Sequence, residues 1–472
     1  MRYEVQIMFI GRQDELQFLE DKYNTEGGQL VVLYGRRRVG KTETLRKFCE
    51  GKEHVFYSCT ESPDELQLAA FSGRVLQKGF PAAEYIKSFS EWNQALSSIA
   101  KLPVEGKKLL VIDEFPYMVK GNASIPSILQ NIWDGRLRNE NVMVVLCGSA
   151  MSFIENEILA EKNPLYGRTT GILKMNEMSF YEAIQFLPNY SALDQIAAFA
   201  ALGGIPHYLK QFDDTLPLGE NICRNILYRG SILYNEVEFL MRQELRETAI
   251  YNAIIEAVAM GNTRLGDIHQ KTQIEKTKLS AYLKNLVNLN ILRREFPVPG
   301  SVKEQANVQR GLYQVTDNFF RFWFAFVFPN LSELEAGDAY GIWEHAVEPA
   351  IDGYTSRIFE DICRQYLRVQ NRRYALPFYF TKIGRWWEKG SEVDIIAIDS
   401  NKQNYLLGEC KFKSSASTLS DLRALQGKFL PDDRDSKVFY CLFSKNGFSD
   451  EVIKTAKSEG VMIITAEEVA RV

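Results

Sequence analysis

The chain has 472 residues, of which 46% are hydrophobic and 25% are charged, and its formal net charge at pH 7 is −4. This length allows about three domains with cores of their own, while the charge excludes a basic surface over the whole chain, so any nucleic-acid-binding patch has to be local. The sequence has neither a secretion signal at its start nor an apolar run long enough to span a membrane, and this favours a cytoplasmic protein with no membrane partner. Its seven cysteines lack CxxC spacing, which favours reduced thiols.

Short apolar segments alternate with helical patterns over residues 1–187. The apolar segments are rich in β-branched residues and lie at 30–34, 55–58, 109–112 and 142–146. Uniformly apolar segments of this length are typical of strands that are buried on both faces of a parallel sheet. Helical patterns, such as those at 42–50 and 126–137, lie between them. The alternation predicts an α/β domain with a parallel sheet and right-handed crossovers.

A phosphate-binding motif follows the first predicted strand. Residues Gly35-Arg36-Arg37-Arg38-Val39-Gly40-Lys41-Thr42 fit the pattern G-x-x-x-x-G-K-[ST], which is that of a P-loop. The two glycines allow a tight loop whose amide groups point at phosphate oxygens, and the helix that follows presents its positive end. Lys41 would place a cation on the β- and γ-phosphates, and Thr42 would offer a hydroxyl to Mg²⁺. We therefore expect residues 35–43, ending with Glu43, to bind ATP with Mg²⁺.

Two acids, Asp113 and Glu114, follow the predicted strand at 109–112. Ligands bind at the carboxyl ends of parallel strands, so this pair is expected at the same cleft as the P-loop. Asp113 would hold Mg²⁺, directly or through water, and Glu114 would orient the water that attacks the γ-phosphate. Without the P-loop upstream, two solvated acids at a strand end would be the better interpretation.

Two further polar residues are candidates for the same site. Ser149 ends the predicted strand at 142–146 and could hydrogen-bond the γ-phosphate or the water, although an ordinary turn explains it equally well. Arg168 could supply positive charge to the γ-phosphate as a finger or sensor. A surface arginine is an equal alternative for Arg168.

The motifs of the first half resemble a known family. They are Phe9-Ile-Gly-Arg-Gln-Asp-Glu-Leu16, YGRRRVGKT, IDEF, CGSAMSF and PLYGR, and together they look like the prokaryotic archaeal-type ATPases of the AAA+/STAND group. The resemblance implies a helical lid over 188–245 and switching between nucleotide-dependent states. It also implies that Pro206 and His207 lie near the nucleotide, whereas the residues alone fit a helix break with a surface histidine equally well.

Residues 246–317 have the pattern of a winged helix. Three helices are predicted at 247–260, 264–271 and 274–290, followed by strands at 291–296 and 311–315 and an exposed loop, 297–309, between them. Lys276, Lys278 and Lys284 lie on or next to the third helix, where DNA-reading modules make their base contacts. Winged helices of this ATPase group also serve as hinges and protein-contact modules, so double-stranded DNA and a protein partner both remain open.

Residues 318–472 carry a second candidate site. Glu409 and Lys411, in Glu409-Cys-Lys411, project to the same face of a predicted strand because side chains alternate along a strand. A neighbouring predicted strand brings Asp394 beside them, and Glu360 on the preceding helix could be a further ligand. Carboxylates hold Mg²⁺ or Mn²⁺ through oxygen, and Lys411 could steady the charge that develops on a phosphodiester.

This D…E-x-K arrangement resembles the PD-(D/E)xK nuclease fold, although Val393 stands where the motif has proline. An edge strand with an exposed salt bridge is the alternative. Basic residues also surround Trp386 and Trp387 in this region, which suits DNA binding and a partly buried core equally well. These residues are Arg372, Arg373, Lys382, Arg385, Lys389, Lys411 and Lys413.

Taken together, these patterns predict a multidomain α/β protein with a P-loop ATPase domain (1–187), a helical lid (188–245), a winged helix (246–317) and a nuclease-like domain (318–472). We expect an ATPase that acts as a nucleotide-gated switch, binds ATP and Mg²⁺, and acts on DNA. Two alternatives stay open. One is a protein-interaction switch whose nuclease-like domain is inactive and which acts with a protein partner or in a homo-oligomer. The other is a nuclease with metal-dependent DNA cleavage.

Overall fold

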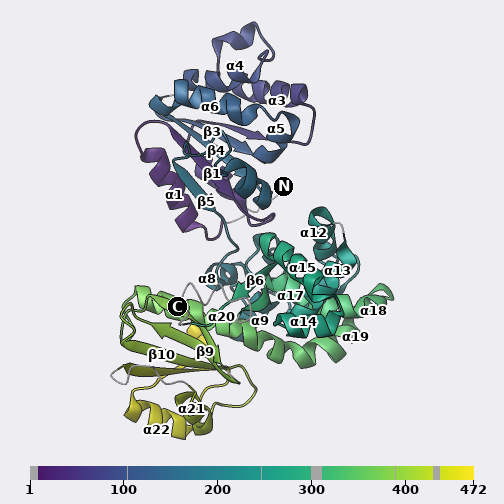
Figure 1. The fold of residues 1–472 in the computed structure, drawn as a ribbon, viewed down its shortest axis with the longest axis vertical. Helices are drawn as coiled ribbons and strands as arrows, with labels where there is room; N and C mark the ends of the chain where they lie inside the picture. Colours follow the sequence, from purple (N-terminus) through teal and green to yellow (C-terminus); the bar gives the residue numbers. More distant parts are fainter. Residues whose placement is uncertain are drawn as a thin grey trace. The chain divides into compact units, whose positions relative to one another are not determined.

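The computed structural model describes residues 9–103, 105–245, 247–298, 311–388, 390–428 and 436–471. The predicted loop at 297–309 lies outside these residues from position 299 onward, as does Lys389. The chain forms two compact units, the first up to Met178 with Ile205–His207, the second comprising Ser179–Gly204 and the residues from Tyr208 onward (Figure 1). The finer division of the second unit into a lid, a winged helix and a nuclease-like domain stays a prediction.

A five-stranded parallel sheet forms the centre of the first unit. Its strands are β1 (Gln29–Tyr34), β2 (His54–Ser58), β3 (Lys108–Asp113), β4 (Val142–Gly148) and β5 (Gly171–Lys174), in the order β2-β3-β4-β1-β5. The strands predicted from apolar runs are confirmed as β1 to β4. The edge strand β5 was not predicted, because its residues alternate between partly buried and exposed, with Ile172 49% exposed.

Helices cover both faces of this sheet. They are α1 (Gln13–Asn24), α2 (Lys41–Cys49), α3 (Asp64–Leu76), α4 (Trp92–Ser97), α5 (Phe115–Gly121), α6 (Ile125–Gly135) and α7 (Met151–Phe153). Side chains from α3 to α6, among them Phe71, Trp92 and Trp133, pack with Leu30 and Val144 of the sheet in one buried cluster. Figure 1 shows α3, α4, α5 and α6 together above the strands. The core therefore lies between the sheet and its helical layers, and the strand ends are left to carry polar residues.

The second unit begins with short helices and continues into three longer ones. Its first helices are α8 (Phe180–Ala183), α9 (Ala192–Leu202), α11 (Leu218–Ile222) and α12 (Glu236–Glu244), with α10 (Pro206–Leu209) at the junction of the two units. The three predicted helices are present as α13 (Thr248–Ala259), α14 (Leu265–Thr272) and α15 (Lys276–Asn288). The strands β6 (Leu292–Glu295) and β7 (Leu312–Val315) then pair antiparallel.

The aromatic segment that follows β7 is part of the core. Helix α17 (Asn318–Phe322) and the turn Trp323–Val327 bury most of their rings, and α18 (Leu331–Glu335) and α19 (Ala339–Ile342) follow. The Trp323 indole donates a hydrogen bond of 2.7 Å to the Tyr234 carbonyl, which satisfies its buried N–H group. Among the helices described, none is long and apolar enough to cross a membrane.

A long helix and a mixed sheet form the C-terminal part of the second unit. The helices are α20 (Ile351–Arg372), α21 (Leu419–Gln426), α22 (Asp450–Glu459) and α23 (Ala466–Ala470). The strands are β8 (Lys382–Glu388), β9 (Ser391–Ile398), β10 (Asn404–Lys411), β11 (Lys437–Ser444) and β12 (Met462–Thr465), in the order β12-β11-β10-β9-β8. Pairing is antiparallel from β8 to β10 and parallel from β10 to β12. The sequence predicts strands at 392–398, 405–413, 438–444 and 461–465, which are confirmed as β9 to β12, whereas β8 was not predicted.

All seven cysteines are buried as free thiols. Burial raises the pKa of every one of these thiols, to about 11 for Cys49 and Cys223.

Candidate functional site

The loop between β1 and α2 has the backbone of a phosphate-binding loop. Gly40 starts α2 with φ of +94°, a conformation that side chains rarely adopt, and Arg38 is also left-handed with φ of 69°. A Cβ atom at Gly35 would lie 2.3 Å from the Met175 carbonyl oxygen, so only glycine fits there. Both glycines of the motif are therefore required by geometry. Of the other loop residues, Val39 is buried, while Arg38 and Glu43 are exposed.

Lys41 points back into the loop. Its side chain is buried at 5% exposure, and its Nζ atom donates hydrogen bonds of 2.9 Å to the carbonyls of Gly35 and Arg36. Burial lowers the pKa of Lys41, and the nearby carboxylates of Glu114 and Asp113 oppose this shift. The ammonium group is thus held inside the loop by uncharged acceptors that a phosphate group could replace.

The P-loop and the acidic end of β3 meet through a side-chain hydrogen bond. Thr42 donates from Oγ1 to Oδ2 of Asp113 over 2.8 Å, and the other carboxylate oxygen of Asp113 accepts from the amide of Glu114 over 3.1 Å. Asp113 is only 3% exposed. The sequence-predicted hydroxyl and carboxylate therefore lie together, and both carry oxygen atoms of the kind that Mg²⁺ prefers as ligands.

Glu114 and Ser149 form a second pair at the ends of the neighbouring strands β3 and β4. Ser149 donates to Oε2 of Glu114 from its hydroxyl over 2.9 Å and from its amide over 3.2 Å. Glu114 itself has a left-handed backbone with φ of 53°, which is unusual for a side chain of this type. The two bonds fix the Glu114 carboxylate, so Ser149 contacts the acid rather than standing apart from it.

Arg12 is a site residue that sequence reasoning missed. Its guanidinium is 3% exposed and donates from Nη2 to the Val39 carbonyl over 2.7 Å, while Nη1 pairs with Glu15 over 2.8 Å. Arg12 thereby ties the start of α1 to the P-loop. The signal was present in the string Phe9–Leu16, which was used only as a mark of resemblance.

The three other residues predicted for this site, which are Pro206, His207 and Arg168, differ from one another in their neighbours. Pro206 lies against the P-loop, with its Cγ atom 3.8 Å from the position of a Cβ atom on Gly40. His207, partly buried, belongs with Pro206 to the first unit, although the residues on either side of Ile205–His207 belong to the second. Arg168 donates to both carboxylate oxygens of Asp134 over 2.7–3.0 Å. That ion pair would have to open before Arg168 could contact a nucleotide.

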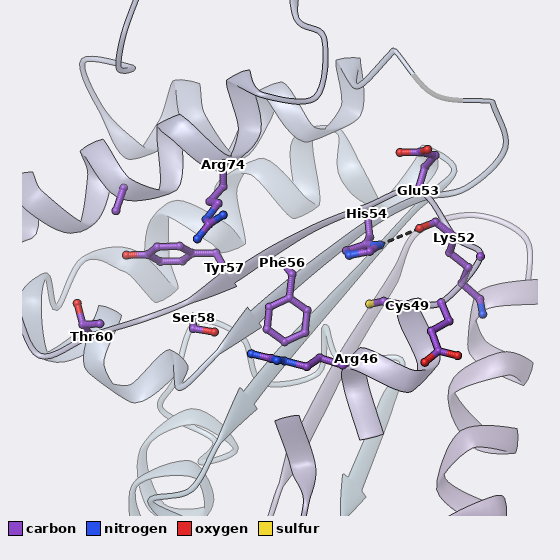
Figure 2. Close-up of a pocket in the computed structure, with 13 residues that line it drawn as sticks. Arg46, Cys49, Lys52, Glu53, His54, Phe56, Tyr57, Ser58, Thr60 and Arg74 are labelled. Atoms are coloured by element: carbon purple, nitrogen blue, oxygen red, sulfur yellow. Dashed lines mark hydrogen bonds between the residues drawn. The ribbon is translucent and has the colours of Figure 1, made fainter. Parts of the chain in front are cut away.

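A cavity of about 850 Å³ lies along the edge strand β2 (Figure 2). It is lined by residues of α2, β2 and α3, including Arg46, Phe56 and Arg74. The Arg46 guanidinium lies 6.0 Å from the centre of the Phe56 ring. None of the residues predicted to bind nucleotide or metal lines this cavity.

The predicted C-terminal residues come together on β9 and β10. The backbone amide of Cys410 donates to Oδ2 of Asp394 over 2.9 Å, which places Asp394 beside the Glu409 strand. Glu409 is 5% exposed and accepts from Lys411 over 2.8 Å and from Lys428 over 2.7 and 2.8 Å. Lys428 was not predicted, because it follows α21 and only the fold brings it to β10. The Glu409 carboxylate is thus held by two ammonium groups.

Charges surround the acids of this cluster. Burial raises the pKa of Glu360 to about 8, against the effect of Arg385, and raises that of Asp394 to about 6, with Glu409 adding to the rise. Arg385 lies 3.3 Å from Glu360 and 3.5 Å from Glu295, and it also pairs with Glu392. Over the residues that the structure describes, no three Asp, Glu, His or Cys side chains gather closely enough to hold a metal ion.

The basic and aromatic residues around β8 divide into two groups. Arg385 is buried in its ion pairs, and Trp386 packs against the core formed by Val393 and Leu407. Arg372, Arg373 and Lys382 are exposed. The partly buried core is therefore the better interpretation for Arg385 and Trp386, whereas the second group consists of exposed cations.

Comparisons with known proteins agree with the site in the first unit. Residues 9–212 match a family described as an ATPase domain predominantly from Archaea, and residues 323–422 match archaeal and bacterial proteins of unknown function. An uncharacterized ATP-binding protein of Methanocaldococcus jannaschii is 53% identical over 47 residues, which are 10% of this chain and 80% of that protein. The Walker-type ATPase of Pyrococcus abyssi shares the fold with a TM-score of 0.53 and 20% identity, over 67% of this chain and 96% of that one.

A longer relative covers nearly the whole chain. An uncharacterized protein of Methanocaldococcus jannaschii is 34% identical over 406 residues, which are 86% of this chain and 88% of that protein. The chain therefore belongs to the family of this protein, and it is a P-loop ATPase with an N-terminal domain of the predominantly archaeal type.

Proposed function

We propose that the chain hydrolyses ATP between the P-loop and the ends of β3 and β4, and that this cycle drives a conformational switch that acts on DNA. The observation that carries the proposal is the 2.8 Å hydrogen bond from Thr42 to Asp113. It joins the nucleotide loop to the acidic strand end, so the groups needed for phosphate binding and for hydrolysis lie within one site.

Lys41 would bind the β- and γ-phosphates, together with the amide groups of residues 35–43. In doing so its Nζ atom would exchange the carbonyls of Gly35 and Arg36 for phosphate oxygens, which are stronger acceptors because they are charged. The buried position of Lys41 strengthens this attraction, since water screens charge less there. Arg36, Arg37 and Arg38 would add positive charge at the mouth of the loop.

Thr42 and Asp113 would hold Mg²⁺. Their oxygen atoms suit this hard cation, and they already lie within contact of each other. When bound, Mg²⁺ neutralises negative charge on the phosphate oxygens during the transfer.

Glu114 would orient the attacking water and take up its proton as the water oxygen bonds to the γ-phosphorus and the bond from that phosphorus to the leaving ADP breaks. Ser149 would position that carboxylate through its two hydrogen bonds. Pro206 and His207, which belong to the unit that carries the P-loop, would sense the bound nucleotide, and Arg168 would serve as a sensor once released from Asp134. These roles together describe an in-line attack of water on ATP.

Action on DNA is proposed for the helices that precede β6. Lys276, Lys278 and Lys284 of α15 are exposed, while Leu279, Leu283 and Leu286 on the same helix are buried. A last helix of this kind, followed by an antiparallel hairpin, is the element that winged-helix modules place in the major groove.

A second candidate function is an ATPase-gated protein-interaction switch, whose nuclease-like C-terminal domain binds a partner protein and does not cleave DNA. The observation that favours it is the pairing of Glu409 with both Lys411 and Lys428, because an acid held by two cations is a poor metal ligand. The arrangement does not fit a metal at Asp394, Glu409 and Glu360, so DNA cleavage is not part of this function.

Steady-state phosphate release and calorimetry with Mg²⁺ and ATP test the ATPase proposal. Glu114→Gln should lower the hydrolysis rate by about 100-fold or more while nucleotide affinity stays near that of the wild type. Lys41→Ala should abolish nucleotide binding. Glu140→Gln, which changes a partly exposed acid of the same unit, is the matched control. A Glu114→Gln protein that hydrolyses ATP at the normal rate would contradict the proposal.

Separate measurements test the DNA proposal and its alternative. Changing Lys276, Lys278 and Lys284 to Ala should weaken duplex binding and flatten its salt dependence, whereas changing the exposed Lys437, Lys454 and Lys457 should not. Incubation with plasmid and Mg²⁺ or Mn²⁺ should leave the DNA uncut. Cleavage that is lost in both Asp394→Ala and Lys411→Ala would instead establish a nuclease.

A further inference from the structure

The loop between α20 and β8 is held in one conformation by its own hydrogen bonds. Asn371, 6% exposed, donates from Nδ2 to the Phe380 carbonyl and accepts from the Phe380 amide at Oδ1, each over 3.0 Å. The amides of Tyr374 and Ala375 also bond back to the end of α20. Phe378 packs on Phe439 with ring centres 5.7 Å apart. The two ends of the loop are thus clamped together.

This clamped loop presents two tyrosines to solvent. Tyr374 is 80% exposed and Tyr379 is 52% exposed, and their rings stack with centres 5.7 Å apart at an interplanar angle of 30°. Tyr374 takes a left-handed backbone conformation with φ of 55°, which is costly for an aromatic residue. Neither ring contributes to the core, so packing does not explain why the loop holds them outward.

Exposed cations flank the tyrosine pair. Arg372, Arg373 and Lys382 are exposed, and no ion pair or hydrogen bond engages their side chains within the described part of the chain. The sequence also has no Asp or Glu between Asp361 and Glu388. The loop therefore combines stacked rings with exposed positive charge and carries no acid of its own, on a protein whose net charge is −4.

We propose that this surface, the tyrosine platform formed by Arg372, Arg373, Tyr374, Tyr379 and Lys382, binds single-stranded DNA. An unpaired base would stack on the exposed ring of the pair, and the cations would contact the phosphates on either side. Stacking suits any base, so binding is tolerant of sequence. The choice of DNA over RNA rests on the proposed function, whereas the match to a single strand rests on the platform alone.

The platform is distinct from the Asp394 cluster of the same sheet, which is formed by Asp394 on β9 and Glu409 on β10. Lys382, at the start of β8, pairs with Ile398, whereas the other end of β8 pairs with residues 391–393, next to Asp394. A strand bound at the platform therefore contacts residues that the ATPase site and the Asp394 cluster do not use. Substitutions there should leave ATP hydrolysis unchanged.

The test measures binding of the full chain to a fluorescent oligothymidylate by anisotropy, in EDTA and without nucleotide, over a range of salt concentrations. Changing Tyr374 and Tyr379 together to Ala should weaken binding by about 10-fold or more and leave the salt dependence unchanged. Changing both to Phe should retain binding, because stacking uses the ring. Tyr85→Ala, at a tyrosine that is 85% exposed in the first unit, is the control.

Changing Arg372, Arg373 and Lys382 together to Gln should reduce the salt dependence of binding by up to about two powers of salt concentration. Absence of salt-dependent binding by the wild type, or full affinity in the double Ala variant, would overturn the proposal. So would tyrosine-dependent binding to anionic lipid vesicles without binding to DNA, or a clear preference for an RNA oligomer of the same length. Because no nucleotide or metal is present, failure here is distinguishable from failure of the proposed ATPase, and because the probe is a single strand, it is distinguishable from failure of duplex binding by α15.

Discussion

Arg12 holds the P-loop from outside the motif. It takes a left-handed backbone conformation with φ of 65° at the start of α1, and its buried guanidinium reaches the Val39 carbonyl. Hydrogen bonds from a charged donor contribute about 1.5–3 kcal/mol. Arg12 therefore acts through the loop and does not need to touch the nucleotide.

Arg12→Ala should weaken the binding of Mg²⁺ and ATP by roughly 10-fold or more. In the variant the P-loop is no longer held by Arg12, so part of the binding free energy is used to order the loop. Calorimetric titration measures the change directly. Arg138→Ala, an exposed arginine of the same unit, should leave the affinity as it is. Equal affinities for the Arg12→Ala protein and the wild type would show that Val39 is held by other contacts.

Glu360 should make the stability of the protein depend on pH. Burial raises its pKa from the ordinary value of 4.5 to about 8, so between these values the folded protein holds a proton that the unfolded chain releases. The stability that this group contributes therefore falls as pH rises from about 4.5 to 8, by at most about 1.4 kcal/mol per pH unit.

Glu360→Gln should remove this part of the pH dependence, since the amide stays neutral. Urea unfolding at several pH values should show the wild type losing stability relative to the variant from pH 5 to 8. Glu451→Gln, at an exposed position of α22, should follow the wild type. If the unfolding free energies of Glu360→Gln and the wild type change with pH in parallel, Glu360 is ionised over this whole pH range and paired with Arg385.

At the scale of elements, the sequence predicts the strands that are buried on both faces. The two strands that it misses, β5 and β8, each lie at one edge of a sheet, while the opposite edge strands β2 and β12 were predicted. Strands β1 and β4 are buried along their whole length, and their apolar runs made them recognisable. Strand β8 was missed because Arg385 interrupts its apolar pattern and the pairing shifts register between Gly384 and Trp386. A charged residue can lie within such a strand only because acids from other elements surround it, and that is information the local sequence does not contain.

The residues of the candidate site could likewise be predicted only in part. The meeting of Thr42 with Asp113 follows from a parallel sheet, because both lie at the carboxyl ends of strands. Arg12 and Lys428 were not predictable in this way, since neither lies at the end of a strand or belongs to a periodic pattern, and only the fold brings each to its partner.

The close backbone approach at Gly35, where β1 turns into the P-loop, can be tested by substitution. Gly35→Ala would bring a methyl group to 2.3 Å from the Met175 carbonyl oxygen, so the backbone has to move, at a cost of about 1–3 kcal/mol. The variant should unfold at a lower temperature and bind ATP more weakly. Gly73→Ala, in α3 with open space around it, should instead stabilise the protein slightly, by up to about 1 kcal/mol. An unchanged melting temperature for Gly35→Ala would contradict the close approach.

At the scale of the whole molecule, the chain has two compact units with separate sheets. The P-loop, Asp113 and Glu114 all lie in the first unit, as does Ile205–His207. A ligand that binds only the folded state stabilises the unit that holds its site, by about 2.7 kcal/mol at 100 times its Kd.

Calorimetric unfolding should therefore show two transitions, of which a non-hydrolysable ATP analogue with Mg²⁺ raises one. Gly35→Ala should lower that same transition, which assigns it to the first unit. Glu360→Gln should shift only the other transition. A single transition that moves as a whole with the ATP analogue would show that the two units unfold together.

The burial of all seven cysteines has a practical consequence for following the ATPase cycle. Alkylating dyes react with exposed thiolates, and in the folded chain every native thiol is covered and kept protonated. A cysteine introduced on the surface of each unit could therefore be labelled selectively without first removing the natural ones. Two such labels would report the distance between the units by energy transfer as ATP binds and is hydrolysed.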